Sequence, residues 1–389
     1  MDRHDVVIVG ARAAGAATAL LLARAGHDVL VVDRARYGSD TLSTHALMRG
    51  GVLQLERWGL LDRIVAEPTP PVHRVTFDYG GAPIVVDVDR PLYAPRRTVL
   101  DRILVDAARE AGADVRFGVD VTGVRTDVDG SVTGISTREH GGGTRHHDAT
   151  LTVGADGVRS LVARAVQAPV TSAAAYATAS IYGHYRGVPA DGYEWNFAAR
   201  AASGAIPTND GRTCVFVSAS PQRFHRELRH DRSAAVRALL AEVSPDLGAR
   251  VLAGALDGPL RAFPGLPGWL RRPFGPGWAL VGDAGYFKDP LTAHGLTDAL
   301  RDAELLVHAV DEGLTGAMPM TAALAGYERV RDDLSRPLLD ATDAIASFDW
   351  RLPDLQVLHE QLSAAMQEEA RFLRALRTPP VRRPLAISA

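Results

Sequence analysis

The chain has 389 residues, of which 46% are hydrophobic and 23% charged, so it has enough apolar material for a large core and two domains. Its formal net charge of −3 gives no strong field that would attract nucleic acid or an acidic membrane surface. No uncharged apolar stretch reaches the roughly 18 residues that a membrane helix needs, so we expect no membrane span.

The first predicted unit is a strand, a glycine turn, a helix and a second strand. Residues 5–10 form a continuous apolar run typical of a buried parallel strand, residues 13–25 are helical, and residues 27–33 are again strand-like. An acidic residue ends the second strand a little over twenty positions after the first glycine. This context predicts a dinucleotide-binding βαβ unit, and a βαβ unit that binds nothing is the alternative.

The glycine turn departs from the usual dinucleotide spacing at one position. Gly10 permits a tight turn and Gly15 lets the helix approach the strand, whereas Arg12 stands where another glycine would let the backbone touch phosphate. We expect the diphosphate to lie slightly farther out, with the Arg12 guanidinium adding compensating charge. Asp33 would accept hydrogen bonds from the adenosine ribose. The predicted contacts at this end are Gly10, Arg12, Ala13, Ala14, Gly15, Asp33 and Arg34.

Two later stretches extend the pattern. Residues 151–160 read LTVGADGVRS, a strand that enters an Asp-Gly turn, and residues 278–306 read WALVGDAGYFKDPLTAHGLTDALRDAELL, a strand, a glycine bend and a helix. With the opening unit, they closely resemble the group A flavoprotein monooxygenase superfamily, the para-hydroxybenzoate hydroxylase-like proteins, whose relatives include geranylgeranyl-type reductases and flavin halogenases. Three motifs in this order are far more specific than one glycine loop.

The resemblance implies an α/β fold: a Rossmann-like FAD-binding domain with an inserted antiparallel β-sheet substrate domain and C-terminal helices. The β-like runs within residues 72–88 and 175–218 support such an insertion. The expected boundaries are 1–70, 96–165 and 270–310 for the FAD-binding domain, 71–95 and 166–269 for the substrate domain, and 311–389 for the C-terminal helical region.

The resemblance also implies contacts to FAD. Asp283 would hold the ribityl chain or ribose, and the turn 290–296 would present backbone N–H groups to the isoalloxazine. The following helix, 297–306, would point its positive end at the flavin and stabilise an anionic reduced form. The turn contacts are Pro290, His294, Gly295 and Leu296.

Four further residues match family positions near the cofactor. Asp156 belongs to the Asp-Gly motif, which in such proteins lies near the pyrophosphate and is implicated in NAD(P)H use. Arg49 and Arg97 match arginines near the cofactor, and Val121 matches a strand position whose backbone contacts adenine.

Three residues are candidates for chemistry. Lys288 is the chain's only lysine and can lose its proton on burial, although we favour an exposed loop lysine paired with Asp289. His45 and Arg49 lie four apart in a helical stretch, so both could face the flavin ring, and His45 could act as an acid or base near neutral pH. A structural histidine is equally consistent there. Tyr286 suits the wall of an apolar pocket better than catalysis.

The histidines at residues 140–147 favour a different interpretation. His140, His146 and His147 flank three glycines between two β-like runs, which is typical of a hairpin tip rather than of a metal site. The sequence therefore predicts no metal. The single cysteine, Cys214, and an N-terminus without a signal-peptide pattern lead us to expect a cytoplasmic protein, as a monomer or homodimer.

One dinucleotide unit is present, so NAD(P)H would visit FAD transiently rather than occupy a domain of its own. The resemblance implies a monooxygenase that uses NAD(P)H and O2 to hydroxylate or epoxidise an apolar or aromatic small metabolite through a flavin C4a-hydroperoxide. Tyr286, Ala293 and Thr297 depart from common family residues near the ring. They leave open an FAD-dependent reductase or dehydrogenase of an apolar, isoprenoid or polyketide-like substrate, or a non-redox flavin-fold protein that binds or cyclises a metabolite.

Overall fold

The first domain is built on a sheet whose central strands are parallel. The computed structural model describes residues 2–139 and 142–382. β1 (Asp2–Val9) pairs in parallel with β2 (Val29–Asp33) and with β8 (Thr144–Gly154). The strand order is β17-β18-β8-β1-β2-β5, and the antiparallel pair β6 and β7 extends from β8. The other strands are β5 (Asp114–Phe117), β6 (Val119–Thr126), β7 (Val132–Glu139), β17 (Phe274–Gly275) and β18 (Trp278–Leu280).

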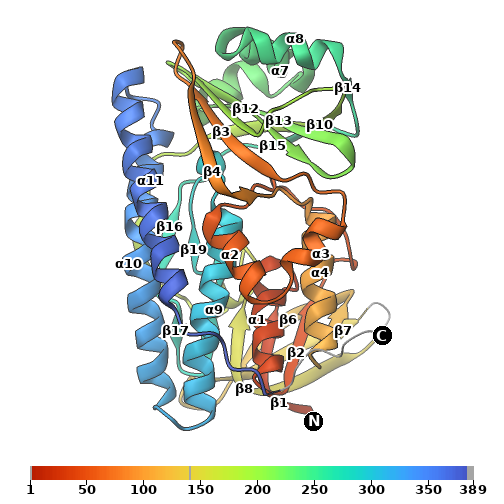
Figure 1. Cartoon of the computed structure of the whole chain (residues 1–389). Helices are drawn as coiled ribbons and strands as arrows, with labels where there is room; N and C mark the ends of the chain where they lie inside the picture. Colours follow the sequence, from red (N-terminus) through yellow and green to blue (C-terminus); the bar gives the residue numbers. More distant parts are fainter. Residues whose placement is uncertain (1, 140–141, 383–389) are drawn as a thin grey trace.

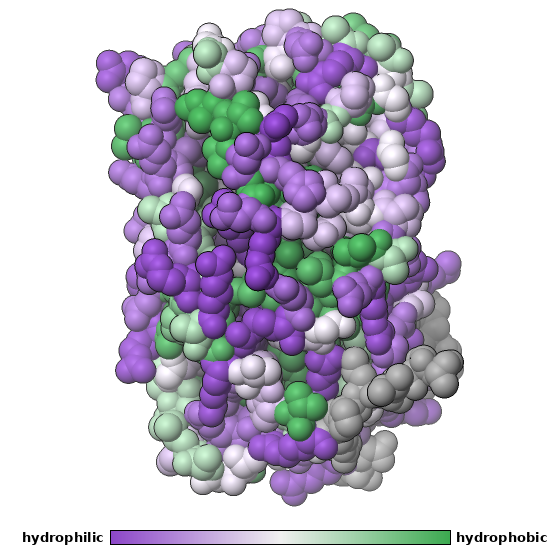
Figure 2. Space-filling view, in the orientation of Figure 1, coloured by the Kyte–Doolittle hydropathy of each residue, from purple (hydrophilic) through white to green (hydrophobic). Residues whose placement is uncertain are grey.

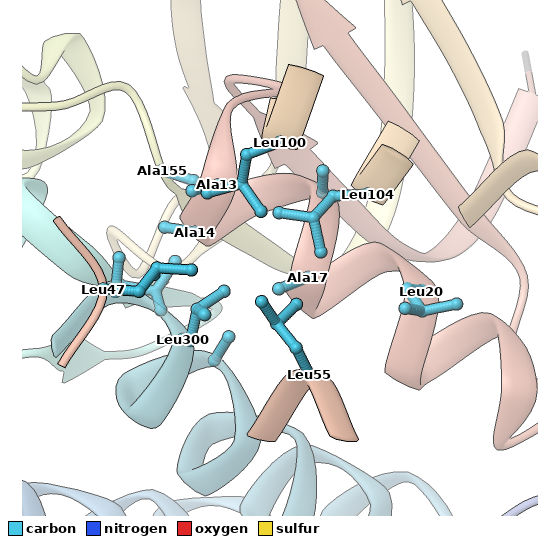
Figure 3. Packing of buried hydrophobic residues seen from close by; sticks show 14 of the residues in the cluster. Ala13, Ala14, Ala17, Leu20, Leu47, Leu55, Leu100, Leu104, Ala155 and Leu300 are labelled. Carbon is cyan, nitrogen blue, oxygen red and sulfur yellow. The ribbon is translucent and has the colours of Figure 1, made fainter. Parts of the chain in front are cut away.

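α1 (Ala13–Arg24) is the central helix of this domain and is buried along its whole length. It packs between α4 (Arg97–Glu110) and α9 (Gly295–Leu314). Its alanines allow these close approaches, and Figure 3 shows Ala13, Ala14 and Ala17 facing leucines of the neighbouring elements. Each fully buried leucine contributes roughly 1.5–3 kcal/mol, so this contact region holds the glycine turn rigidly in place.

The second domain, which the sequence predicts as the substrate domain, is a sheet with the order β14-β10-β13-β12-β11-β3-β4. Its strands come from both expected segments, because β3 pairs with β11. That pair is parallel, because no hairpin joins these two strands and no turn fixes their direction, whereas the neighbouring pairings of the sheet are antiparallel as expected. The bounds are β3 (Val72–Asp78), β4 (Ile84–Leu92), β10 (Ala179–Arg186), β11 (Tyr193–Ala198), β12 (Ala201–Thr208), β13 (Arg212–Ala219), β14 (Ala255–Leu256) and β15 (Arg261–Phe263), which pairs with β10.

The two faces of this sheet have different neighbours. Val215 and Val217 of β13 belong to a core with α7 (Arg232–Val243) and α8 (Pro245–Ala253). Cys214 and Phe216 of the same strand belong to the core shared with the first domain. Because side chains alternate along a strand, one face is covered by helices and the other faces the first domain. Figure 1 shows this sheet stacked on the first domain, with α7 and α8 on its outer side.

Two long helices run along one side of both domains (Figure 1). α10 (Met320–Ala346) packs on α9, and α11 (Leu352–Ala375) packs on α10 and α2 (Arg49–Arg57). A small sheet joins β9 (Val170–Ala173), β16 (Trp269–Arg271) and β19 (Tyr286–Phe287), so β9 lies outside the large substrate sheet. The remaining helices are α3 (Leu61–Ala66), α5 (Leu161–Ala165) and α6 (Pro221–Arg223).

The surface is mostly polar on the face seen in Figure 2, with small apolar patches among charged groups. Three consecutive residues of the edge strand β4, Ile84, Val85 and Val86, are exposed. Among the described residues, no helix combines the length and the apolar character that crossing a membrane requires.

Candidate functional site

The glycine turn after β1 needs glycine at two positions. Gly10 has φ +105°, and a Cβ there would lie 2.4 Å from the carbonyl oxygen of Ala155. A Cβ on Gly15 would lie 1.8 Å from the carbonyl oxygen of Gly10. Both contacts are too short for any side chain, so the glycines press the start of α1 against the ends of β1 and β8. The N-terminus of α1, with its free N–H groups, is thereby fixed above the sheet.

Asp33 fixes the same turn from the end of β2. Its Oδ2 accepts the N–H of Ala11 at 2.7 Å, and its Oδ1 accepts the N–H of Ala35 at 2.7 Å. A surface hollow of about 250 Å³ opens beside it, with Arg12, Tyr37 and Phe117 among its walls. This hollow lies where the sequence predicts the adenosine. A larger pocket of about 950 Å³ lies elsewhere, around Val132 and Trp278, and holds none of the predicted contacts.

The Arg12 side chain lies along the start of α4. It donates hydrogen bonds to Asp101 and to the carbonyl oxygen of Ser39, both at 3.1 Å. Arg97 donates to both carboxylate oxygens of Asp101, at 2.9 and 3.1 Å. Arg12 and Arg97, predicted separately as cofactor contacts, therefore meet on one carboxylate.

A second arginine pair adjoins the first. Arg96 and Arg261 each donate to Asp40 at 3.1 Å, and Asp40 lies in the same loop as Ser39. The two groups together place four guanidinium groups around two carboxylates, which leaves two positive charges in excess. That excess matches the charge of a bound diphosphate.

Asp283 lies in a tight turn after β18, within Gly282–Ala284. Burial raises the pKa of its carboxyl to about 6, and nearby Arg97 opposes that rise. Its half-buried carboxylate is not used to cap the backbone N–H groups of this turn, so hydroxyl donors of a ligand would complete it. A Cβ on Gly282 would lie 2.8 Å from the Cβ of Ala14, so this turn is pressed against the start of α1. These features fit a dinucleotide with a polyhydroxyl chain.

Other predicted contacts are placed less directly. Asp156 caps α5, with its Oδ2 accepting the N–H of Leu161 at 2.5 Å, while its Oδ1 is buried and has no hydrogen-bond partner in the described part of the chain. Arg49 opens α2 and is exposed, and Arg34 is exposed beyond β2. Val121 lies on β6 and is half-buried. The structure does not gather these last three around the glycine turn by any direct contact.

The turn before α9 is held by Asp289. Its carboxylate accepts the N–H of Thr178 at 2.6 Å and the N–H of Leu291 at 2.9 Å. Burial raises its pKa to about 6, and the Thr178 hydrogen bonds oppose the rise. After Pro290, the backbone passes through a left-handed residue, Ala293, at φ +51°, and the helix begins.

α9 is longer than the sequence predicted, since it spans Gly295–Leu314. A Cβ on Gly295 would meet nothing within 4 Å, so its first turn, with Leu296, borders open space. His294 precedes this turn as the N-cap residue, but its side chain is buried and points back into the protein. The unpaired N–H groups of the first turn would suit a partially negative ligand.

The surroundings of Lys288 differ from those expected from the sequence. Its side chain is only 1% exposed and forms an ion pair with Asp298, not with Asp289, so the exposed-loop interpretation is wrong. Its Nζ also lies 3.2 Å from Nδ1 of His294. Burial lowers the pKa of Lys288, although Asp298 opposes that change. The first turn of α9 folds over this lysine, which local sequence could not show.

A network of buried charges extends from that lysine. Arg301 is fully buried and donates to Asp298 at 3.1 Å, to Asp302 at 2.7 Å and to Glu369 of α11 at 2.7 Å. Glu369 also lies 2.9 Å from Nε2 of His294. Burial alone would lower the pKa of His294, but Glu369 and Asp298 overcome it, so that pKa is raised. Sequence reasoning missed Arg301 and Glu369, because both helices carry several charged residues and nothing local shows which of them are buried.

Tyr286 is buried beside this network. Its hydroxyl donates to the carbonyl oxygen of Ser335 at 3.3 Å, and its ring centroid lies 5.2 Å from Nζ of Lys288. Burial raises its pKa well above the ordinary value. These contacts give Tyr286 a packing role.

His45 also differs from expectation. It has φ +70° and precedes α2, so it shares no helix face with Arg49. Its Nε2 lies 2.8 Å from Nε2 of His184 on β10, and the two rings are stacked with their centroids 5.1 Å apart. Burial lowers the pKa of both histidines, that of His184 to about 4. Sequence reasoning did not select His184.

The segment that carries His45 connects the two domains. The N–H of Ser43 donates to the Tyr182 hydroxyl of β10 at 3.0 Å, and the N–H of Met48 donates to Oγ1 of Thr297 in α9 at 3.1 Å. Residues 43–48 therefore run from the substrate sheet to the start of α9.

Among the residues that the structure describes, metal-ligating side chains gather in two buried groups, each with ligand atoms within 4.8 Å of one another. In the group of His294, Asp298 and Glu369, Lys288 and Arg301 already neutralise the carboxylates. His45, His184 and Cys214 form the other group. Of the histidines at residues 140–147, His146 and His147 lie on β8 and contact Ser136 and Thr137, and His140 lies outside the described residues.

Comparison with known proteins gives a consistent result. Residues 3–342 match the model of a family described as an FAD binding domain. The chain is 31% identical over 378 residues to digeranylgeranylglycerophospholipid reductase 1 of Methanopyrus kandleri, covering 91% of this chain and 92% of that protein. It is 26% identical over 396 residues to rifampicin monooxygenase of Rhodococcus hoagii, covering 94% and 75%. A crystal structure of a PqsL variant of P. aeruginosa has the same fold, with TM-score 0.80, 23% identity and coverage of 94% and 100%.

Proposed function

Since this chain belongs to the FAD-binding domain family of flavoprotein monooxygenases and their relatives, with FAD as its cofactor, we propose that it is an NAD(P)H-dependent monooxygenase of an apolar or aromatic small metabolite. FAD supplies the redox chemistry when bound, taking electrons from NAD(P)H and passing them to O2. The protein binds and orients the reactants and keeps water away from them.

The observation that carries the proposal is the junction at residues 43–48. One end of this segment contacts the apolar face of the substrate sheet, and the other contacts the start of α9. A substrate held against that face would lie next to the turn that the family resemblance assigns to the flavin. The single βαβ unit leaves no second nucleotide domain, which favours a reductant that binds transiently.

The residues divide into three proposed roles. Gly10, Asp33 and Asp283 hold the dinucleotide, while the arginine groups around Asp101 and Asp40 neutralise its phosphates. Lys288 positions the first turn of α9, because its amine contacts Asp298 and His294 beneath that turn. His45 faces the substrate.

Oxygen-dependent turnover tests the proposal. The FAD-loaded protein should oxidise NADH or NADPH faster when an aromatic substrate is added, consume O2 in step, and incorporate one atom of labelled O2 into the product. Turnover that persists without O2 would contradict monooxygenation.

A reductase of an apolar substrate is the second candidate. The 31% identity to digeranylgeranylglycerophospholipid reductase 1, over nearly the full length of both chains, favours it. An anaerobic assay separates the two: a reductase would consume its electron donor continuously and saturate a carbon–carbon double bond with O2 absent, and a monooxygenase would stop after reducing its own FAD once.

A further inference from the structure

The boundary between the two domains contains a polar pair in apolar surroundings. His45 is 1% exposed and His184 is 6% exposed, and their Nε2 atoms are 2.8 Å apart. A hydrogen bond between two imidazole nitrogens needs one N–H donor and one bare acceptor, so these two atoms share a single proton. Burial and mutual repulsion keep both rings neutral near pH 7, and Arg96 and Arg261 act in the same direction.

The two Nδ1 atoms of the pair have opposite hydrogen-bonding roles. In the neutral pair, the ring that donates its Nε2–H has a bare Nδ1, and the ring that accepts carries its proton on Nδ1. Nδ1 of His45 is therefore an acceptor in one arrangement and a donor in the other. This atom is buried and has no hydrogen-bond partner among the residues that the structure describes. A buried atom of this kind is destabilising unless a ligand or a water completes it.

The chain holds this imidazole in place at the expense of backbone strain. His45 has φ +70°, a left-handed conformation that non-glycine residues seldom adopt. Two hydrogen bonds support it: the His45 N–H donates to Oγ of Ser43 at 3.1 Å, and the Ser43 N–H donates to the Tyr182 hydroxyl at 3.0 Å. Tyr182 and His184 both come from β10, so the substrate sheet fixes the ring from two sides.

The surroundings of the pair are apolar. Tyr182 lies edge-on to His184 at 6.1 Å, and on the same sheet face Phe216 packs against Trp195 at 5.5 Å. Cys214 is adjacent, and burial raises the pKa of its thiol to about 12, so it is uncharged. The positive charges that act on the pair come from Arg96 and Arg261, which bind Asp40, and from Arg97 and Arg212, so a bound cation is unfavourable.

We propose that Nδ1 of His45, held by His184, is the recognition site for a hydroxyl group on the substrate, which makes that substrate a phenol, enol or alcohol on an apolar skeleton. A hydroxyl both donates and accepts, so it completes Nδ1 in either proton arrangement, whereas a carbonyl or ether oxygen can only accept. That this hydroxyl belongs to the substrate rests on the proposed function. The binding of a hydroxyl at Nδ1 of His45 does not depend on that function.

Calorimetric binding of two matched probes to the FAD-loaded protein tests this inference. 2-Naphthol carries the hydroxyl, and 2-methoxynaphthalene has the same skeleton without the donor. The wild-type protein should bind 2-naphthol roughly threefold to tenfold more tightly, which is the usual effect of one hydrogen bond. His45→Ala should abolish this preference.

Two variants separate recognition from structural support. His45→Asn places an amide atom at the position of Nδ1 and tolerates the left-handed backbone, so it should keep part of the preference. His308→Ala removes a buried histidine from the far end of α9 and should leave the preference unchanged. FAD content and circular dichroism show whether each variant is folded.

Three outcomes would overturn the inference. They are equal binding of both probes by the wild type, an unchanged preference in folded His45→Ala, and a stoichiometric transition metal that is lost in Cys214→Ala. The binding experiment needs neither NAD(P)H nor O2. The protein can therefore prefer the hydroxyl probe and yet show no oxygen-dependent turnover, or show that turnover without the preference, so the two proposals fail separately.

Discussion

At the scale of single residues, three aspartates of this site differ in the number of hydrogen bonds that their carboxylates accept. Asp33 receives two backbone N–H groups and Asp289 receives three hydrogen bonds, so both are satisfied within the protein. Asp283 receives none from the described residues, yet burial raises its pKa to about 6. Of these three residues, Asp283 is therefore the one whose carboxylate we expect a ligand to complete.

Asp283→Ala should release FAD. Losing a hydrogen bond to a charged group costs about 1.5–3 kcal/mol, so we expect affinity for FAD to fall by roughly 10- to 100-fold. Absorbance of the purified protein and titration of the apoprotein with FAD measure this. The exposed Asp62→Ala of α3 is the control, and full flavin content in Asp283→Ala would refute the assignment.

His184 should make stability depend on pH. Its folded pKa is about 4 and its unfolded pKa is about 6.5, so its contribution is complete above pH 6.5 and is lost as the pH falls toward 4. The loss should approach ~1.4 kcal/mol per pH unit in that window. Asp283 and Asp289, with raised pKa values, act in the opposite sense, so the comparison must be with His184→Phe. Urea unfolding at pH 7.5 and 5.5 should show the smaller loss in the variant.

At the scale of elements, α11 contributes one buried carboxylate to the charge network at the start of α9. Glu369 is the only one of its described acidic residues that is buried, and it binds Arg301 and His294 at the start of α9. A Cβ on Gly50 of α2 would approach this carboxylate to 3.4 Å, so three helices converge there. The sequence analysis predicted a C-terminal helical region but not the partners of α10 and α11, because an amphipathic pattern does not specify which surface covers it.

Glu369→Gln should destabilise the protein by roughly 3–5 kcal/mol, because it leaves Arg301 and His294 partly unpaired in a buried network. Glu368→Gln on the same helix is the matched control, since its ion pair with Arg371 is exposed and should contribute below about 1 kcal/mol. Urea unfolding measures both. Equal losses in the two variants would mean that the buried network contributes little.

On the scale of the whole molecule, the cofactor should act as a structural ligand. The four arginines around Asp40 and Asp101 carry two excess positive charges, and they link the glycine turn, α4 and the substrate domain. Bound FAD would neutralise that excess, and the apoprotein would keep it.

Removing FAD should lower the melting temperature by several degrees. A ligand at 100 times its dissociation constant stabilises the folded state by about 2.7 kcal/mol. Added salt should recover part of the loss in the apoprotein by screening the arginines, and it should have less effect on the loaded protein. Scanning calorimetry at two ionic strengths checks this; a melting temperature independent of FAD would contradict it.

The sequence by itself determined the dinucleotide end. Gly10, Gly15 and Asp33 act through the backbone next to them, so their spacing already carries the geometry. Only the tertiary structure decided the pairs Lys288–Asp298, Arg301–Glu369 and His45–His184. The last two join residues 68 and 139 positions apart. Which charges are buried, and beside what, depends on how helices and sheets pack, and that packing is a property of the whole fold rather than of any local pattern.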